Sequence, residues 1–222
     1  MDLATRVAAT LPLLLDGLWT TLVICTASMV MAVVMAVPLV AARRSRHRWI
    51  AGLAIGWVGL IRGLPIVILV LLMYFGLPAL LDFGRVPAFW VGVVALGLNG
   101  GAFVSEILRA AIARVPPGQW EAAAALGLSR VSVWRLVVIP QMLPVALPAL
   151  VGEATFIVKA SPVLSLITVV DLTRRSQQVA MQTFDPLAPM LAAALLYFVV
   201  LFALSRLAAV LEARLAPQGL AA

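Results

Sequence analysis

Charged side chains are scarce in this sequence, and that scarcity excludes an ordinary soluble domain. Only 11% of the 222 residues are charged, whereas 64% are hydrophobic. A soluble domain carries roughly twice that charged fraction. Because one helical crossing of a bilayer takes roughly 20 apolar residues, the composition predicts an all-α integral membrane protein with several crossings.

Residues that commonly carry catalysis or hold metals are equally rare. The single cysteine, Cys25, has no second cysteine for an internal disulfide, and the single histidine, His47, has no second histidine with which to share a metal. No glycine-rich phosphate loop ending in Gly-Lys-Ser or Gly-Lys-Thr occurs. We therefore predict no metal site and no catalytic residues. The chain is not expected to be an enzyme, and any ATP that drives it would be bound by another chain.

Apolar runs predict five membrane spans in a single domain over 1–222. The spans cover roughly 17–42, 50–81, 88–108, 134–159 and 186–206. The second is too long for one straight crossing, so its early part is expected partly at the inner interface, with Arg62 near the inner end. The more polar stretch 161–185 is expected at or outside the outer face.

Basic residues set the predicted orientation, because cytoplasmic loops of membrane proteins carry an excess of Lys and Arg. An outer N-terminus and a cytoplasmic C-terminus place most of these residues inside. The inner group is Arg43, Arg44, Arg46, Arg48, Arg109, Arg114, Arg130, Arg135, Arg206 and Arg214, and the outer group is Arg6, Arg85, Arg174 and Arg175. The same bias accounts for the net charge of +7 without a nucleic-acid partner.

A short helix is predicted between the third and fourth spans, at roughly 118–128. A run of alanines flanked by Glu and Leu favours helix from Gln119 to Leu126. Glu121 is expected in its first turn, where a carboxylate suits the helix dipole. Gly127 is expected to end the helix, and Ser129 to cap the next one. A helix with so few large side chains can lie close against another backbone, although an ordinary connector is the alternative.

Prolines in the fourth span are candidates for the lining of a transport path. Pro140, Pro144 and Pro148 recur every four residues and therefore share one helix face. Each removes an N–H and frees a carbonyl, which is tolerated at membrane depth only against protein or a water-filled cavity. Simple packing kinks are the alternative.

Polar residues complete the candidate path. Glu153 and Lys159 are predicted within or near the membrane, where ionisable groups often mark a substrate route. Lys159 could instead reach the outer interface. Asn99 and Ser161 are further candidates, with helix packing as the alternative for Asn99. Glu106 and Arg109 are three residues apart on a helix, so a structural ion pair is predicted at the inner boundary.

The order of these segments resembles the polar amino-acid permease family of ABC importers. The stretch GQWEAAAALGLS at 118–129 is similar to the family's EAA loop, a cytoplasmic coupling helix. The likeness continues in GLWTTLVI at 17–24, IRGLPIVILVLLMYFGLP at 61–78, LNGGAFVSEILRAAI at 98–112 and IPQMLPVALPAL at 139–150.

The resemblance implies a type I importer permease of five spans in a prokaryotic inner membrane. It implies that five residues couple this chain to the ATPase: Glu121, Ala122, Ala123, Leu126 and Gly127. The implied partners are a dimer of ATP-binding cassette ATPases, a second permease subunit, like or unlike, and an extracytoplasmic solute-binding protein. ATP and Mg would be bound by the ATPase, and this chain itself would bind no cofactor.

Three departures from the family pattern leave the solute open. Leu64 stands where the family usually has Thr, Gly152 where it has Asn, and Ala160-Ser161-Pro162 where it has Thr-Ser-Leu. The last two lie near the presumed path, so the solute could be a zwitterion such as a compatible solute instead of a common amino acid. The predicted function is import. The alternative is a membrane anchor or regulatory subunit that recruits a cytoplasmic partner without moving solute.

Overall fold

The computed structural model describes residues 2–82, 84 and 86–215, and their regular structure is entirely helical. Met1, Phe83, Arg85 and residues 216–222 of the predicted domain therefore lie outside the described residues. The helices, in chain order, are α1 (Leu3–Thr10), η1 (Leu11–Leu14), α2 (Leu15–Arg43), α3 (Arg48–Gly63), α4 (Ile66–Leu71), the π-helical η2 (Leu72–Gly76), α5 (Leu77–Leu81), α6 (Ala88–Ala113), α7 (Pro117–Ala125), α8 (Arg130–Val133), the π-helical η3 (Trp134–Val138), α9 (Ile139–Ala160), η4 (Ser161–Ile167), α10 (Leu172–Thr183) and α11 (Leu187–Leu215).

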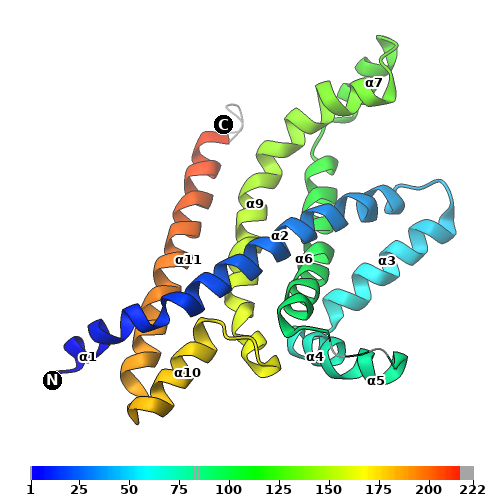
Figure 1. Cartoon of the computed structure of the whole chain (residues 1–222). Helices are drawn as coiled ribbons and strands as arrows, with labels where there is room; N and C mark the ends of the chain where they lie inside the picture. Colours follow the sequence, from blue (N-terminus) through cyan, green and yellow to red (C-terminus); the bar gives the residue numbers. More distant parts are fainter. Residues whose placement is uncertain (1, 83, 85, 216–222) are drawn as a thin grey trace.

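Helical runs long and apolar enough to cross a membrane confirm the predicted fold class. Four such runs occur among the described residues, at Leu3–Arg43, Ala88–Ala113, Arg130–Ile167 and Leu187–Leu215. A fifth span is reached if α3 and the run Ile66–Leu81, which meet at an angle of 103°, are counted as one broken span. Figure 1 shows α7 and the C-terminal end of α11 at one end of the bundle, with the N-terminus and α10 at the other.

The predicted second span is broken at Leu64 and Pro65. Leu64 has an extended backbone, with φ −86° and ψ 131°, because a residue that precedes proline is pushed out of the α region. Pro65 then precedes the first turn of α4. The prediction that residues 50–81 are too long for one straight helix is confirmed, and which arm crosses the membrane stays a prediction.

Small residues allow α2 and α6 to pack closely through the centre of the bundle. A Cβ at Gly97 would lie 2.8 Å from the Sδ of Met31, and one at Gly100 would lie 3.2 Å from the Cβ of Ala32. Helix pairs in membranes associate through such small-residue contacts. As a result α6 is buried along most of its length, and other helices pack around it.

The polar stretch 161–185 packs against the rest of the helical bundle. Leu164, Ile167, Asp171 and Leu172 are fully buried. The stretch contains the amphipathic helix α10, which contacts α2 and α11. Its polar residues lower the average hydropathy, and that average conceals an apolar face that belongs to the core. The predicted position of this stretch at or outside the outer membrane face stays a prediction.

Candidate coupling helix and transport path

Local sequence determines where α7 begins and ends. The helix starts at Pro117, so Glu121 lies in its second turn. The prediction that Glu121 lies in the first turn is therefore wrong. Gly127 has a φ of +66°, a value that suits glycine because it has no Cβ. The N–H of Gly127 donates to the carbonyl of Ala124, and that of Leu128 to Ala123. This pattern is a Schellman motif, so the predicted C-terminal role of Gly127 is confirmed.

The helix that follows begins as predicted. The Oγ of Ser129 accepts a hydrogen bond of 3.2 Å from the backbone N–H of Ser132. A serine at this position satisfies a backbone donor that has no partner within the helix. Both ends of the turn between α7 and α8 are therefore held by residues whose type fits the backbone they adopt.

Most of the predicted coupling residues form the outer surface of α7. Glu121, Ala122 and Gly127 are exposed, and Leu126 is 77% exposed despite its large apolar side chain. Ala123 is only 2% exposed, so it supports the helix from beneath instead of forming its outer surface. The result is an exposed surface composed mainly of small residues, with the carboxylate of Glu121 and the apolar side chain of Leu126 at its larger positions.

A cluster of two tryptophans and an arginine holds α7 to the rest of the chain. Trp120 of α7 and Trp134 of η3 meet edge to face, with ring centroids 6.0 Å apart. The guanidinium carbon of Arg44 lies 5.5 Å from the Trp120 ring and 5.9 Å from the Trp134 ring. The amide of Gln141 also donates to that of Gln119, at 3.5 Å. Sequence reasoning missed this cluster, since it treated Arg44 only as a sign of membrane orientation.

Glu106 forms the centre of a second charged cluster. Its Oε2 accepts from the Nε of Arg109 at 2.8 Å, which confirms the predicted pair. Its Oε1 accepts from Arg43 of α2, which the sequence did not predict. Arg62 of α3 approaches the same oxygen at 3.8 Å. One carboxylate thus meets three guanidinium groups from three helices.

Glu153 and Asn99, two of the predicted path residues, are buried in the bundle. Asn99 on α6 and Glu153 on α9 are 5% and 8% exposed. The Oε1 of Glu153 has no hydrogen-bond partner among the described residues, and it lies 3.6 Å from where a Cβ at Gly100 would be. A buried carboxylate oxygen without a partner is costly, so Glu153 is the path candidate whose burial the described residues leave uncompensated.

The other predicted path residues are distributed differently. Lys159 is exposed, whereas Ser161 is buried and donates its hydroxyl to the carbonyl of Val158 at 2.9 Å. Pro144 and Pro148 lie half-buried inside α9, which continues through both. Among the described residues, no hydrogen bond joins Asn99, Glu153, Lys159 and Ser161 to one another.

One face of α9 carries a continuous exposed stripe. Its members recur at helical spacing and are Val145, Ala149, Gly152, Phe156 and Lys159. Phe156 lies 6.0 Å from Phe103 of α6, centroid to centroid. The guanidinium carbon of Arg62 lies 5.0 Å from the centroid of Phe103. The stripe therefore borders an aromatic ring of α6, Phe103, and a cation of α3, Arg62.

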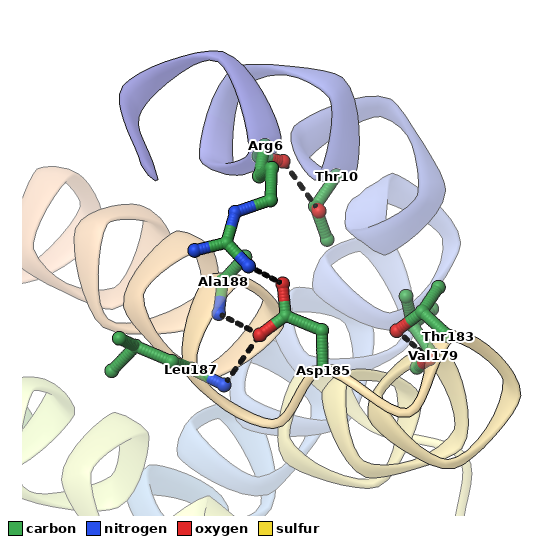
Figure 2. A network of polar contacts seen from close by, with 7 residues as sticks. All are labelled: Arg6, Thr10, Val179, Thr183, Asp185, Leu187 and Ala188. Atoms are coloured by element: carbon green, nitrogen blue, oxygen red, sulfur yellow. Dashed lines mark hydrogen bonds and ion pairs between the residues drawn. The ribbon is translucent and has the colours of Figure 1, made fainter. Parts of the chain in front are cut away.

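Polar contacts at the opposite end of the bundle join α1 to the turn that precedes α11. In Figure 2, Asp185 lies between Arg6 and the start of α11. Its Oδ2 pairs with Arg6 at 3.0 Å, and its Oδ1 accepts from the N–H groups of Leu187 and Ala188. Nearby, the buried Asp171 accepts from the N–H of Arg174 at 2.9 Å. Burial raises the pKa of the Asp171 carboxyl, and its backbone hydrogen bonds oppose the shift.

Comparison with known proteins places this arrangement in a family. Residues 28–217 match the family described as "Binding-protein-dependent transport system inner membrane component". The arginine transport system permease protein ArtQ of Bacillus subtilis is 35% identical over 205 residues, covering 92% of this chain and 93% of its own length. The nopaline transport system permease protein NocM of Agrobacterium fabrum is 34% identical over 215 residues, covering 93% and 89% respectively.

A solved structure has the same fold. The crystal structure of an amino acid ABC transporter with histidines superposes with a TM-score of 0.87 at 34% identity, covering 96% of this chain and 99% of that one. Both the sequence match and the structural match extend over almost the whole chain. The chain belongs to the family of binding-protein-dependent transport system inner membrane components, and it is a multi-pass membrane permease.

Proposed function

We propose that this chain is the permease subunit of an ATP-driven importer of polar amino acids or related zwitterionic solutes. The observation that carries the proposal is α7, an exposed helix of small residues at one end of the bundle with Leu126 protruding from it. The names of the relatives, which include arginine and nopaline permeases, support the solute class.

The partners follow from the family and from what the chain lacks. An ATP-binding cassette ATPase dimer docks on α7 and binds ATP and Mg. A second permease subunit, like or unlike, covers the exposed faces of the bundle, and an extracytoplasmic binding protein delivers the solute. The N-terminus lies outside and the C-terminus in the cytoplasm, an arrangement supported by the basic residues near the α7 end, such as Arg44, Arg114 and Arg130.

The Trp120–Trp134 contact offers a route for movement from the ATPase to the path. Trp120 belongs to α7, whereas Trp134 lies in the helical run Arg130–Ile167 that continues into α9. A displacement of α7 by the ATPase therefore also displaces α9 and its exposed stripe. A ligand shifts a conformational equilibrium only through different contacts in the two states, and docking on α7 supplies such a difference.

Leu126 provides the direct test. Leu126→Asp places a carboxylate in the docking surface, so we expect the ATPase to co-purify at least tenfold less and solute-stimulated ATP hydrolysis to fall accordingly. Leu126→Met keeps an apolar side chain and serves as the matched control. Wild-type co-purification and wild-type hydrolysis in Leu126→Asp would contradict the docking role of α7.

Uptake by the reconstituted complex tests the function as a whole. Vesicles containing this chain, its ATPase and its binding protein should accumulate at least one member of a panel of polar amino acids and zwitterionic osmolytes, in an ATP-dependent manner. ATPase recruitment without uptake of any solute would instead indicate a membrane anchor.

A further inference from the structure

The loop between α2 and α3 carries positive charge that this chain does not balance. Arg44, Arg46 and Arg48 are exposed, and none of them pairs with an acidic side chain among the described residues. Arg43, directly before them, differs because it pairs with Glu106. We call Arg44, Arg46 and Arg48 the basic patch. Its uncompensated charge favours an anion from outside the chain.

The start of α3 adds to this charge. His47 precedes the helix, but its side chain accepts no hydrogen bond from the first turn, and that turn holds no acidic residue. The free N–H groups at a helix N-terminus carry a partial positive charge and favour an anion. Arg46 and Arg48 stand on either side of His47 in the sequence. The patch and the first turn of α3 therefore offer donors to a group with several acceptor oxygens, such as a phosphate.

Two aromatic rings hold the basic patch beside α7. The guanidinium carbon of Arg44 lies 5.5 Å from the ring centroid of Trp120 and 5.9 Å from that of Trp134. A cation–aromatic contact orients a guanidinium and leaves its N–H groups available to an anion. Because Trp120 belongs to α7, the patch lies at the end of the bundle that the proposed orientation places on the cytoplasmic side.

An apolar stripe continues from the basic patch along the exposed face of α3. Its large side chains recur at helical spacing and are all exposed: Trp49, Leu53, Trp57 and Leu60. The opposite face of the helix is the one that packs on the bundle. Beside the stripe, a Cβ at Gly52 or Gly56 would meet no atom of a neighbouring segment within 4 Å. This face therefore leaves room for an apolar chain that begins at the patch.

We propose that the basic patch and the exposed face of α3 bind an anionic phospholipid of the inner leaflet. Arg46, Arg48 and the first turn of α3 bind the phosphate, and an acyl chain lies along the stripe. A charged patch that continues into an apolar stripe matches a molecule with a charged head and an apolar tail, and a soluble anion would use only the patch. A headgroup with net negative charge is favoured, because a zwitterionic headgroup brings its own cation to the arginines. This inference goes beyond the proposed import function and takes from it only the orientation.

Lipids that share their acyl chains but differ in headgroup test the site. The complex of this chain with its ATPase would be placed in nanodiscs of phosphatidylglycerol and phosphatidylcholine in equal amounts. It would then be released into detergent, and the lipids that it retains would be counted by native mass spectrometry. We expect the wild-type complex to retain phosphatidylglycerol in preference to phosphatidylcholine. The double variant Arg46→Gln, Arg48→Gln should lower that preference roughly tenfold, because arginines near a membrane surface attract anionic lipids.

A matched variant separates this site from a general effect of net charge. The double variant Arg206→Gln, Arg214→Gln removes the same charge from exposed positions on α11, and it should keep the wild-type preference. An unchanged preference in the Arg46 and Arg48 variant, or an equal loss in the Arg206 and Arg214 variant, would overturn the proposed site.

Two further measurements separate a lipid from a soluble anion. Leu53→Gln interrupts the stripe without changing the charge, so it should lower the retention of phosphatidylglycerol severalfold, and millimolar inorganic phosphate should not displace the retained lipid. Full retention in Leu53→Gln, displacement by phosphate, or no preference in the wild-type complex would overturn the proposal. Each of these results would leave the import function standing, because vesicle uptake is measured separately.

Discussion

Helices α6 and α9 are equally apolar but are packed very differently. The most apolar window of α6 has a mean hydropathy of 1.6, and that of the run containing α9 has 1.7. Yet 67% of the first window is buried inside the chain, against 22% of the second. Hydropathy thus indicates that both helices belong in a membrane, but it does not distinguish a helix at the centre of the bundle from one that is largely exposed.

The difference originates in where the small residues face. A Cβ at Gly97, Gly100 or Gly101 of α6 would press on atoms of α2 or α9, so these glycines allow close packing. A Cβ at Gly152 of α9 would meet no atom of a neighbouring segment within 4 Å, so this glycine faces open space on the exposed stripe. The glycines of α6 therefore stabilise the packing of the subunit, whereas Gly152 of α9 leaves room beside its exposed face.

Matched substitutions at these two glycines should separate stability from transport, and this is the largest effect expected. Gly97→Leu forces a side chain against Met31, and overpacking of this kind costs roughly 1–3 kcal/mol. Gly152→Leu should leave the thermal unfolding of the detergent-solubilised complex unchanged while it abolishes most solute uptake. Equal loss of thermal stability in the two variants would contradict the contrast between α6 and α9.

The next largest effect is expected from a substitution in the Glu106 cluster, because this cluster joins the C-terminal part of α6 to α2 and α3. Glu106→Gln leaves the guanidinium groups of Arg43, Arg62 and Arg109 without their shared carboxylate. The cluster is only partly buried, so we expect a loss on the order of 1–2 kcal/mol, less than for a fully buried pair. The measurement is thermal unfolding, with Arg109→Gln as the control.

Arg109 is half-exposed in its side chain, so its removal should cost only about 0.2–1 kcal/mol, as for surface pairs. A loss in Arg109→Gln as large as that in Glu106→Gln would show that the Glu106–Arg109 pair alone matters, and that α2 and α3 are held by other contacts.

The smallest effect is expected at the opposite end of the bundle, in the network of Figure 2. Arg6→Gln removes only an exposed ion pair, worth about 0.2–1 kcal/mol and weakened by salt. Asp185→Ala also removes the acceptor for two N–H groups at the start of α11, so it should cost roughly 1 kcal/mol more. Hydrogen exchange at Leu187 and Ala188 would detect the difference, and equal exchange in the two variants would contradict it.

Features set by neighbours in sequence were largely predictable. Gly127 and Ser129 adopt the roles expected of a helix end and a helix start, because their backbone partners lie three to five residues away. The Glu106–Arg109 pair belongs to the same class. Glu121 was misplaced by one turn because the helix starts at Pro117, and proline at the first helical position is favourable.

Features set by contacts between distant segments were not predictable. Arg43 is 63 residues from Glu106 in sequence, and nothing local distinguishes it from the other arginines of its basic run. The stacking of Arg44 on Trp120 and Trp134 depends in the same way on how three segments meet. Averaged polarity also concealed the buried face of α10, where the spacing of apolar residues was the usable signal.

The most direct test of the account is the accessibility of α7 to a membrane-impermeant thiol reagent. Ala125 is exposed on α7, whereas the native Cys25 is buried, so Ala125→Cys provides a single reactive thiol. We expect labelling in inside-out vesicles, protection when the ATPase is bound, and no labelling in intact cells. Labelling from the outer surface of intact cells, or labelling that the bound ATPase does not reduce, would contradict the role of α7 as the cytoplasmic docking helix.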